Sequence, residues 1–126
     1  MLGKPTPWAH LPNARHIDAV IADMKTRPDV WRIAWGAARD AVRGAARDAA
    51  WDVAWCVARE PARLATRTAK QAAAQDAILA LIAWDDCAHL LDLPSTTLRT
   101  MADLCDAPAC HQAVLLLPYV LVKEST

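Results

Sequence analysis

Residues 30–77 divide into twelve tetrads, VWRI AWGA ARDA VRGA ARDA AWDV AWCV AREP ARLA TRTA KQAA AQDA. The second position of every tetrad is Trp, Arg or Gln, and the fourth is Ala, Val or Ile except at Pro61. Alanine is the best helix former, and a four-residue period brings side chains to one side of a helix, so the stretch predicts α-helices. We call the second-position residues the ridge: Trp31, Trp35, Arg39, Arg43, Arg47, Trp51, Trp55, Arg59, Arg63, Arg67, Gln71 and Gln75.

The phase of the ridge limits how long one helix can carry it. Four residues turn a helix by about 400°, so the ridge moves round by about 40° per tetrad. No single neighbour can follow such a stripe, so either helices pack on both sides or the helix breaks and resets its phase. Pro61 supplies one break, because proline disfavours helical backbone in the preceding residue and is tolerated in a first turn. We expect a long helix over about 29–59, bent at Gly44, and a second long helix from Pro61.

The segment before the tetrads has two parts. Residues 1–12 are rich in proline and predict an extended N-terminal arm that packs by Trp8 or stays mobile. Asn13 then has the character of an N-cap for a helix that ends near Thr26. Its apolar side chains recur at helical spacing; they are Ile17, Val20, Ile21 and Met24.

The segment after the tetrads predicts two more helices. The second long helix is expected to run through Leu91 and to stop before Pro94, and Ser95 or Thr96 caps a shorter helix after it. Pro108 opens the last helix, which Pro118 kinks or ends. Residues 114–117 of that helix are polar on no side, so we expect them in the buried centre of the fold.

These elements predict an all-α bundle of about five helices in a single domain over residues 1–126. Two long helices carry the tetrads, and the C-terminal helix is buried. Six Trp, three Gly and no Phe, with alanine the commonest residue, disfavour a sandwich, a barrel or a Rossmann sheet. The longest apolar stretch, 113–122, is too short to span a membrane, and no signal sequence opens the chain. We therefore expect a cytoplasmic protein without a membrane partner.

The charge is unevenly distributed along the chain. Lys+Arg and Asp+Glu are both 14, yet residues 1–70 contain twelve of the basic and only seven of the acidic residues. Either the two halves neutralise each other across helices, or a basic face is left for an anionic partner. The zero net charge disfavours duplex nucleic acid, whose binding is driven by counterion release.

Like charges repeat along the ridge at a spacing where helices usually place opposite ones. Arg39, Arg43 and Arg47 follow one another at i+4, as do Arg59, Arg63 and Arg67. Arg39, Arg47 and Arg67 have no acidic residue three or four positions away, so the repulsion has to be relieved from outside their own helix. One solution is an anionic ligand. The other is a set of carboxylates from the acidic half, with the tryptophans as core; the candidates are Asp76, Asp85, Asp86 and Asp92.

A ligand site can be assembled from the ridge. The guanidinium fork binds phosphate at two points, and an indole face stacks a base for about 1–3 kcal/mol. The same residues also stack on one another within proteins, so the pattern alone does not decide between the two uses. The predicted ligand is a small anionic nucleotide, and the candidate ligand-binding residues are Trp35, Arg39, Arg43, Arg47, Trp51 and Trp55.

Catalysis and metal binding have little support. The four cysteines form no C-x-x-C pair, so reduced thiols without zinc are expected. Cys87 and His89 lie about 200° apart on a helix and do not face each other, which disfavours a nucleophile–base pair. His89 is predicted to be a surface partner of Asp85 or Asp86. We expect a non-enzyme without a cofactor.

Two blocks after the tetrads carry a resemblance. Residues 83–93, AWDDCAHLLDL, and 113–118, AVLLLP, together with the tetrads, resemble a family of small Ala/Trp-rich proteins encoded by bacteriophages. In these relatives the run of Arg/Trp-Asp-Ala-Ala units varies in length and the same two blocks follow it. The likeness covers nearly all of residues 11–122. It implies a small non-enzymatic protein that acts against a host defence in the host cytoplasm.

Ridge and resemblance together predict an anti-defence protein that sequesters a nucleotide-type immune signal. The first alternative is an inhibitor that binds a host defence protein through exposed Trp and Arg, which are typical interface hot spots. The second is a structural component of the virion. A ridge that winds round its helix also favours homo-oligomers, because a small bundle leaves part of it uncovered.

Overall fold

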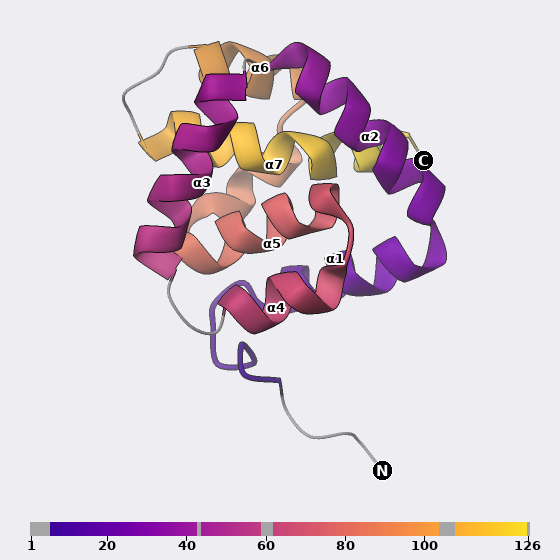
Figure 1. Cartoon of the computed structure of the whole chain (residues 1–126), viewed down its shortest axis with the longest axis vertical. Coiled ribbons are helices and arrows are strands. Elements are labelled where there is room, and N and C mark those ends of the chain that lie inside the picture. The colour runs from indigo at the N-terminus through magenta and orange to yellow at the C-terminus, as the bar shows by residue number, and fades with distance from the viewer. Residues whose placement is uncertain (1–5, 43, 59–61, 104–107, 126) are drawn as a thin grey trace.

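The structure is a computed structural model that describes residues 6–42, 44–58, 62–103 and 108–125. Over these ranges the chain is helical and contains no strand, as the all-α prediction requires (Figure 1). The elements are α1 (Ala14–Thr26), α2 (Pro28–Ala41), α3 (Gly44–Ala58), α4 (Ala62–Ala69), α5 (Ala72–Ala83), the 3-10 helix η1 (Cys87–Asp92), α6 (Ser95–Asp103) and α7 (Pro108–Glu124).

Two helices form the centre of the molecule. α5 and α7 run side by side through the middle of Figure 1, with α3 across one end and α4 along α5. α7 also packs against α2 and α6, so it is enclosed on several sides. Residues 114–117 are buried, which confirms the predicted core position of the aliphatic run. Pro118 does not end the helix, since α7 continues to Glu124.

The prediction of two long helices is wrong. α2 ends at Ala41, where the following Val42 adopts an extended backbone, and α3 begins at Gly44. The second stretch also breaks, because Lys70 takes a left-handed conformation with φ 66° between α4 and α5. The expected total of about five helices is therefore too low over the described residues. The predicted boundary at Pro61 lies outside them.

The extra breaks have a physical reason in the drift of the tetrads. Each tetrad helix is short enough that its contact face rotates by little more than about 100°, and each break resets the phase. The residues kept against the core are the first-position alanines, whose small side chains allow close helix approach. In α2 and α3 these are Ala34, Ala38, Ala50, Ala54 and Ala58, all buried. The ridge, one residue further along each tetrad, flanks this contact face.

The end of α5 is set by tertiary partners. The Asn13 side-chain amide donates to the carbonyls of Leu81 at 2.9 Å and Trp84 at 3.1 Å, and the Cys87 thiol donates to that of Ala80 at 3.4 Å. These contacts satisfy acceptors that a helix end leaves free. Asn13 occupies the N-cap position of α1, as predicted, and its backbone carbonyl accepts from the Ile17 N–H at 3.0 Å, but its side chain makes no capping bond there.

The described part of the N-terminal arm is folded. Residues 6–12 turn, with the Leu11 N–H donating to the Trp8 carbonyl at 3.0 Å, so the arm is not extended there. Trp8 is buried and its indole N–H donates to Asp18 at 2.8 Å, which confirms packing by Trp8. Residues 1–5 of the predicted arm lie outside the described residues.

Candidate functional site

The ridge residues line two hollows. A cavity of about 340 Å³, which we call the Trp35 cavity, is lined by Trp35 and Arg39 of α2, Arg47 of α3 and Asp76 of α5, among others. A groove of about 390 Å³, which we call the Trp51 groove, is formed by α3, α4 and α5. Its lining consists of Trp51, Trp55, Arg63, Thr66, Arg67 and Gln75. Five of these six are second-position residues of tetrads.

A buried carboxylate stands between the two hollows. Asp76 has 2% of its side chain exposed and accepts hydrogen bonds from Arg47 Nε at 3.2 Å and Arg47 Nη2 at 3.0 Å. The indole N–H of Trp51 donates to the same carboxylate at 2.5 Å. The three side chains form the Asp76 triad. Because Arg47 lines the cavity and Trp51 the groove, the triad holds one wall of each.

The burial of Asp76 has an electrostatic cost. Desolvation raises the pKa of its carboxyl from 3.8 to about 6, and the charge and hydrogen bonds of Arg47 and the Trp51 N–H oppose that rise. The free energy of removing a carboxylate from water can exceed the attraction that one cation provides, especially when 28% of the side chain of that cation is exposed, as in Arg47. Arg47 therefore offsets only part of the desolvation cost of Asp76.

Arg47 is also held by aromatic rings on two helices. Its guanidinium carbon lies 4.3 Å from the centroid of the Trp35 ring and 5.4 Å from that of Trp51. The guanidinium carbon of Arg39 lies 5.9 Å from the Trp35 ring. These are cation–π distances, so part of the Arg/Trp pattern serves contacts within the protein. Arg39 is exposed and has no carboxylate partner within the described residues.

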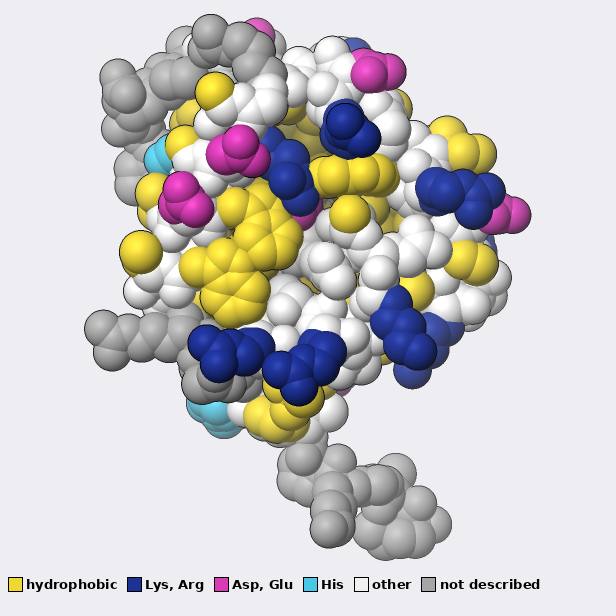
Figure 2. All heavy atoms as spheres, in the orientation of Figure 1, with side chains coloured by type: hydrophobic (Ala, Val, Ile, Leu, Met, Phe, Trp, Pro, Cys, Tyr) yellow, Lys and Arg dark blue, Asp and Glu magenta, His cyan; other side chains and the backbone are white. Residues whose placement is uncertain are grey.

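The Trp51 groove combines aromatic, cationic and amide groups. Trp51 and Trp55 are half-buried, with ring centroids 5.8 Å apart and planes inclined by 41°. Arg67 is exposed and has no ion-pair partner in the described part of the chain. Arg63 lies one helical turn before it on α4, and the side-chain amide of Gln75 makes no hydrogen bond to other described residues. Figure 2 shows large hydrophobic side chains over α3 and Lys/Arg side chains over α4 on this face.

The six predicted ligand residues are divided by the fold. Trp35, Arg39 and Arg47 belong to the cavity, whereas Trp51 and Trp55 belong to the groove. Arg43 lies outside the described residues. Arg47 was grouped with Trp51 and Trp55 as a ligand cation, and it does contact Trp51, but its charge is paired with Asp76. Of the four proposed neutralising carboxylates, Asp76 is the one that pairs with an arginine over the described ranges.

Sequence reasoning missed three groove residues, Arg63, Arg67 and Gln75, as ligand candidates. The signal was present, because all three occupy the second tetrad position. The pattern did not show that α5 would pack against both α3 and α4, so that residues of all three helices line one groove. That adjacency depends on the breaks after Ala58 and Ala69.

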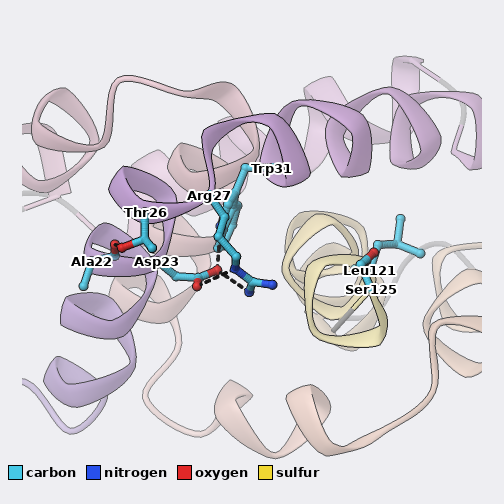
Figure 3. A network of polar contacts seen from close by, with 7 residues as sticks. All are labelled: Ala22, Asp23, Thr26, Arg27, Trp31, Leu121 and Ser125. Atoms are coloured by element: carbon cyan, nitrogen blue, oxygen red, sulfur yellow. Dashed lines mark hydrogen bonds and ion pairs between the residues drawn. The ribbon is translucent and has the colours of Figure 1, made fainter.

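A second triad has the same composition at another place. The Asp23 triad consists of Asp23, Arg27 and Trp31 at the junction of α1 and α2 (Figure 3). Arg27 donates to both carboxylate oxygens, at 2.9 Å and 2.7 Å, and the indole N–H of Trp31 donates at 2.8 Å. Hydrogen bonding from Arg27 lowers the pKa of Asp23, partly opposed by burial. Trp31 is fully buried and stacks on Tyr119, with centroids 5.4 Å apart.

The Cys87–His89 region contains no catalytic arrangement. Cys87 is buried, and desolvation raises the pKa of its thiol to about 12, so the thiolate is strongly disfavoured. His89 is exposed and its partner is Asp86, as predicted, but the contact runs from Nδ1 to the backbone carbonyl at 2.6 Å and not to the carboxylate. Within the described ranges no three His, Cys, Asp or Glu side chains converge as metal ligands. None of the described helices is sufficiently long and apolar to cross a bilayer.

No protein-family model, curated protein or solved structure matches this chain. The site is therefore interpreted from its own geometry.

Proposed function

We propose that this protein is a non-enzymatic binding protein that holds a nucleotide-type anion in the Trp51 groove and so sequesters it. The observation that supports the proposal is the joint lining of one groove by two indoles, two guanidinium groups and an amide. Its volume of about 390 Å³ lies within the range of small-molecule sites.

Each group has a role that its chemistry suits. A base stacks on the exposed side of Trp55 or Trp51, since an indole accepts any base by its flat face. Arg67 and Arg63, one turn apart on α4, bind phosphate oxygens. The amide of Gln75 both donates and accepts, so it pairs with the edge of a base.

The electrostatic balance favours the groove over the cavity for a nucleotide. The groove lining contains two cations and no carboxylate among the described residues. The Trp35 cavity contains Arg39 and Arg47 but also Asp48 and Asp76, which cancel them when ionised. A ligand with several negative charges therefore gains more in the groove.

The biological part of the proposal rests on the resemblance to phage proteins. A phage protein that binds a nucleotide without converting it removes a signal from the host cytoplasm, and such a protein needs no catalytic group. We accordingly propose a phage-encoded anti-defence protein whose ligand is a nucleotide-type immune signal.

Calorimetry with cyclic nucleotides and ADP-ribose derivatives tests this function. We expect micromolar or tighter binding of at least one compound to the wild type. Trp55→Ala should weaken it by about 5- to 150-fold, the loss of one base–indole stack. Arg67→Ala should weaken binding by a larger factor at low salt than at high salt, because salt screens the charge of an exposed arginine. Arg15→Ala, an exposed arginine on α1 outside both hollows, is the matched control.

Two outcomes would reject the groove assignment. One is that no compound of the panel binds at millimolar concentration. The other is tight binding that neither Trp55→Ala nor Arg67→Ala changes, which would place the ligand elsewhere.

A second candidate function is inhibition of a host defence protein by direct contact. Val53 and Val57 are exposed one turn apart on α3, on the same helix as Trp55, and Leu64 is exposed on α4. Apolar groups beside Trp and Arg are typical of protein interfaces. A pull-down from host lysate separates the candidates, because a nucleotide binder recovers no stoichiometric protein. Detection of the protein in purified particles would instead support a virion component.

A further inference from the structure

The Trp35 cavity contains four charged groups, and their net charge depends on whether the buried carboxyl group of Asp76 is protonated. Arg39, Arg47, Asp48 and Asp76 are the charged residues of its described lining. With both carboxyl groups ionised, their charges sum to zero. With Asp76 protonated, the cavity carries a net charge of +1 and Arg47 has lost its counter-ion.

We propose that the Trp35 cavity is a binding site for a small oxyanion, held by Arg39 and Arg47, and that protonation of Asp76 opens this site by releasing the charge of Arg47. The ligand class is a phosphate-type group, alone or on a small organic molecule. The site differs from the Trp51 groove and does not depend on the proposed nucleotide function.

The geometry of Arg47 supports a second anion contact. Two of its five N–H donors are directed at Asp76, through Nε and Nη2. Stacking on the Trp35 ring at 4.3 Å holds the guanidinium plane in the cavity wall. The remaining donors belong to a residue that lines the cavity, so an oxyanion can bind without displacing the arginine.

Arg39 provides the second cation. Its side chain is exposed, lines the same cavity, and contacts the Trp35 ring at 5.9 Å without an ion-pair partner among the described residues. Two guanidinium groups that contact one ring and line one cavity suit an oxyanion that is bound at two points. A cavity of about 340 Å³ is larger than one phosphate group needs, since a water occupies about 30 Å³, so it also accommodates an organic body.

Within the described lining, no second buried carboxylate is placed to pair with Arg47 when Asp76 is protonated. α7 meets the cavity with Val114 and Pro118, and neither α1 nor η1 places a charged side chain in the described lining of either hollow. Asp48 is exposed to solvent, so its charge is screened. The charged side chains that share the cavity with Asp76 are Arg39 of α2 and Arg47 and Asp48 of α3. Arg63 and Arg67 of α4 line the Trp51 groove, on the other side of Trp51.

Asp76 changes its protonation state in mildly acidic solution. Desolvation raises the pKa of Asp76 to about 6, so mild acid protonates it while ordinary surface carboxyl groups remain ionised. An anion on Arg47 favours the protonated form further, because it competes with the carboxylate for the same cation. Binding of the oxyanion and uptake of a proton are therefore linked.

Sulfate is the probe, because its charge does not change between pH 5 and 8. We expect the wild type to bind sulfate about tenfold more tightly at pH 5 than at pH 8. Asp76→Asn should bind it equally at both values, near the wild-type affinity at pH 5. This variant retains all four histidines, so any pH dependence due to them persists in it.

Variants of single arginines locate the site. Arg39→Ala should weaken sulfate binding by about tenfold or more at pH 5, whereas Arg67→Ala in the groove and Arg15→Ala on α1 should not change it. An unchanged affinity in Arg39→Ala, or a loss in Arg67→Ala, would overturn the placement.

A measurement on the wild type alone covers the case in which Asp76→Asn fails to fold, as judged by circular dichroism. Calorimetry of sulfate binding at pH 7 in buffers of different ionisation enthalpy should report the uptake of about half a proton. Absence of proton uptake, or the same pH dependence in Asp76→Asn as in the wild type, would overturn the proposal.

Discussion

The Asp23 and Asp76 triads are built from the same three residue types and differ in almost every physical property. In both, an arginine and a tryptophan four residues apart donate to one aspartate. Asp23 lies four residues before its arginine on the chain and has 29% of its side chain exposed. Asp76 comes from another helix and has 2% exposed. The pKa of Asp23 is lowered by hydrogen bonding and that of Asp76 is raised by desolvation, so burial decides the sign.

The largest expected effect is the removal of either carboxylate. Asp76→Ala should lower the free energy of unfolding at pH 7 by about 3 kcal/mol, since it leaves Arg47 and the Trp51 N–H without an acceptor and opens a small cavity. Asp23→Ala should cost less, because water reaches that position and can take the place of the carboxylate. Urea denaturation of both variants measures the difference. Equal losses would mean that burial is not what distinguishes the triads.

The pH dependence of stability should have opposite signs in the two triads. Asp76 has a folded pKa above its unfolded value, so folding takes up a proton between about pH 4 and 6 and the wild type gains stability relative to Asp76→Asn as the pH falls through that range. The gain is at most about 1.4 kcal/mol per pH unit. Asp23 has a lowered folded pKa, so its contribution is present above about pH 4 and is lost as the pH falls further.

Denaturation curves of wild type, Asp76→Asn and Asp23→Asn at half-unit intervals from pH 2.5 to 7.5 check this prediction. Differences between each variant and the wild type cancel the titration of all other groups. If the free energy of unfolding of the wild type fell relative to that of Asp76→Asn on acidification, the direction that we assign would be contradicted.

A smaller effect is expected from changing the cation. Arg47→Lys keeps the charge but loses the two-point bond to Asp76 and the flat contact with Trp35, so it should cost about 1–2 kcal/mol. Arg27→Lys also loses a two-point bond, but its partner Asp23 has 29% of its side chain exposed against 2% for Asp76, so water can replace that bond and the loss should be smaller. Thermal and urea unfolding of the two variants give the comparison, and a larger loss in Arg27→Lys would reverse it.

The smallest effect is expected at an ion pair outside both triads. Arg32 and Asp29 lie 2.8 Å apart on α2, and both are mostly exposed. Arg32→Ala should leave the urea midpoint unchanged within error, since exposed pairs gain little in water. A clear shift of the urea midpoint would show that this ion pair stabilises the protein more than exposed pairs usually do.

Several features of the fold were predictable because they depend on local patterns. α1 was expected to end near Thr26, and its four predicted apolar residues are its buried ones. α6 begins at Ser95, as expected, although the Ser95 hydroxyl donates to Glu124 and does not cap the helix, and the burial of residues 114–117 follows from continuous apolarity. The breaks after Ala41 and Ala69 were not predicted, because no proline marks them; Val42 and Lys70 leave helical geometry in their tertiary context.

The candidate site was predictable in residue type and not in grouping. The ridge identified the large side chains that line both hollows, since the second tetrad position differs so clearly from the other three. It also placed Asp76 among four possible partners for the arginines. Which aspartate pairs, and which tryptophans share a groove, depends on how α5 packs against both α3 and α4.

The amino-acid sequence by itself determined that the chain is helical, that alanine faces the helix contacts or the solvent, and that Arg and Trp follow one ridge, because these depend on residues within a turn or two of each other. Tertiary structure alone decided in which of two identical sets of side chains the carboxylate is buried, with its pKa raised, and in which it stays in contact with water. Access to water and the proximity of distant charges set that outcome, and both are properties of the packed helices.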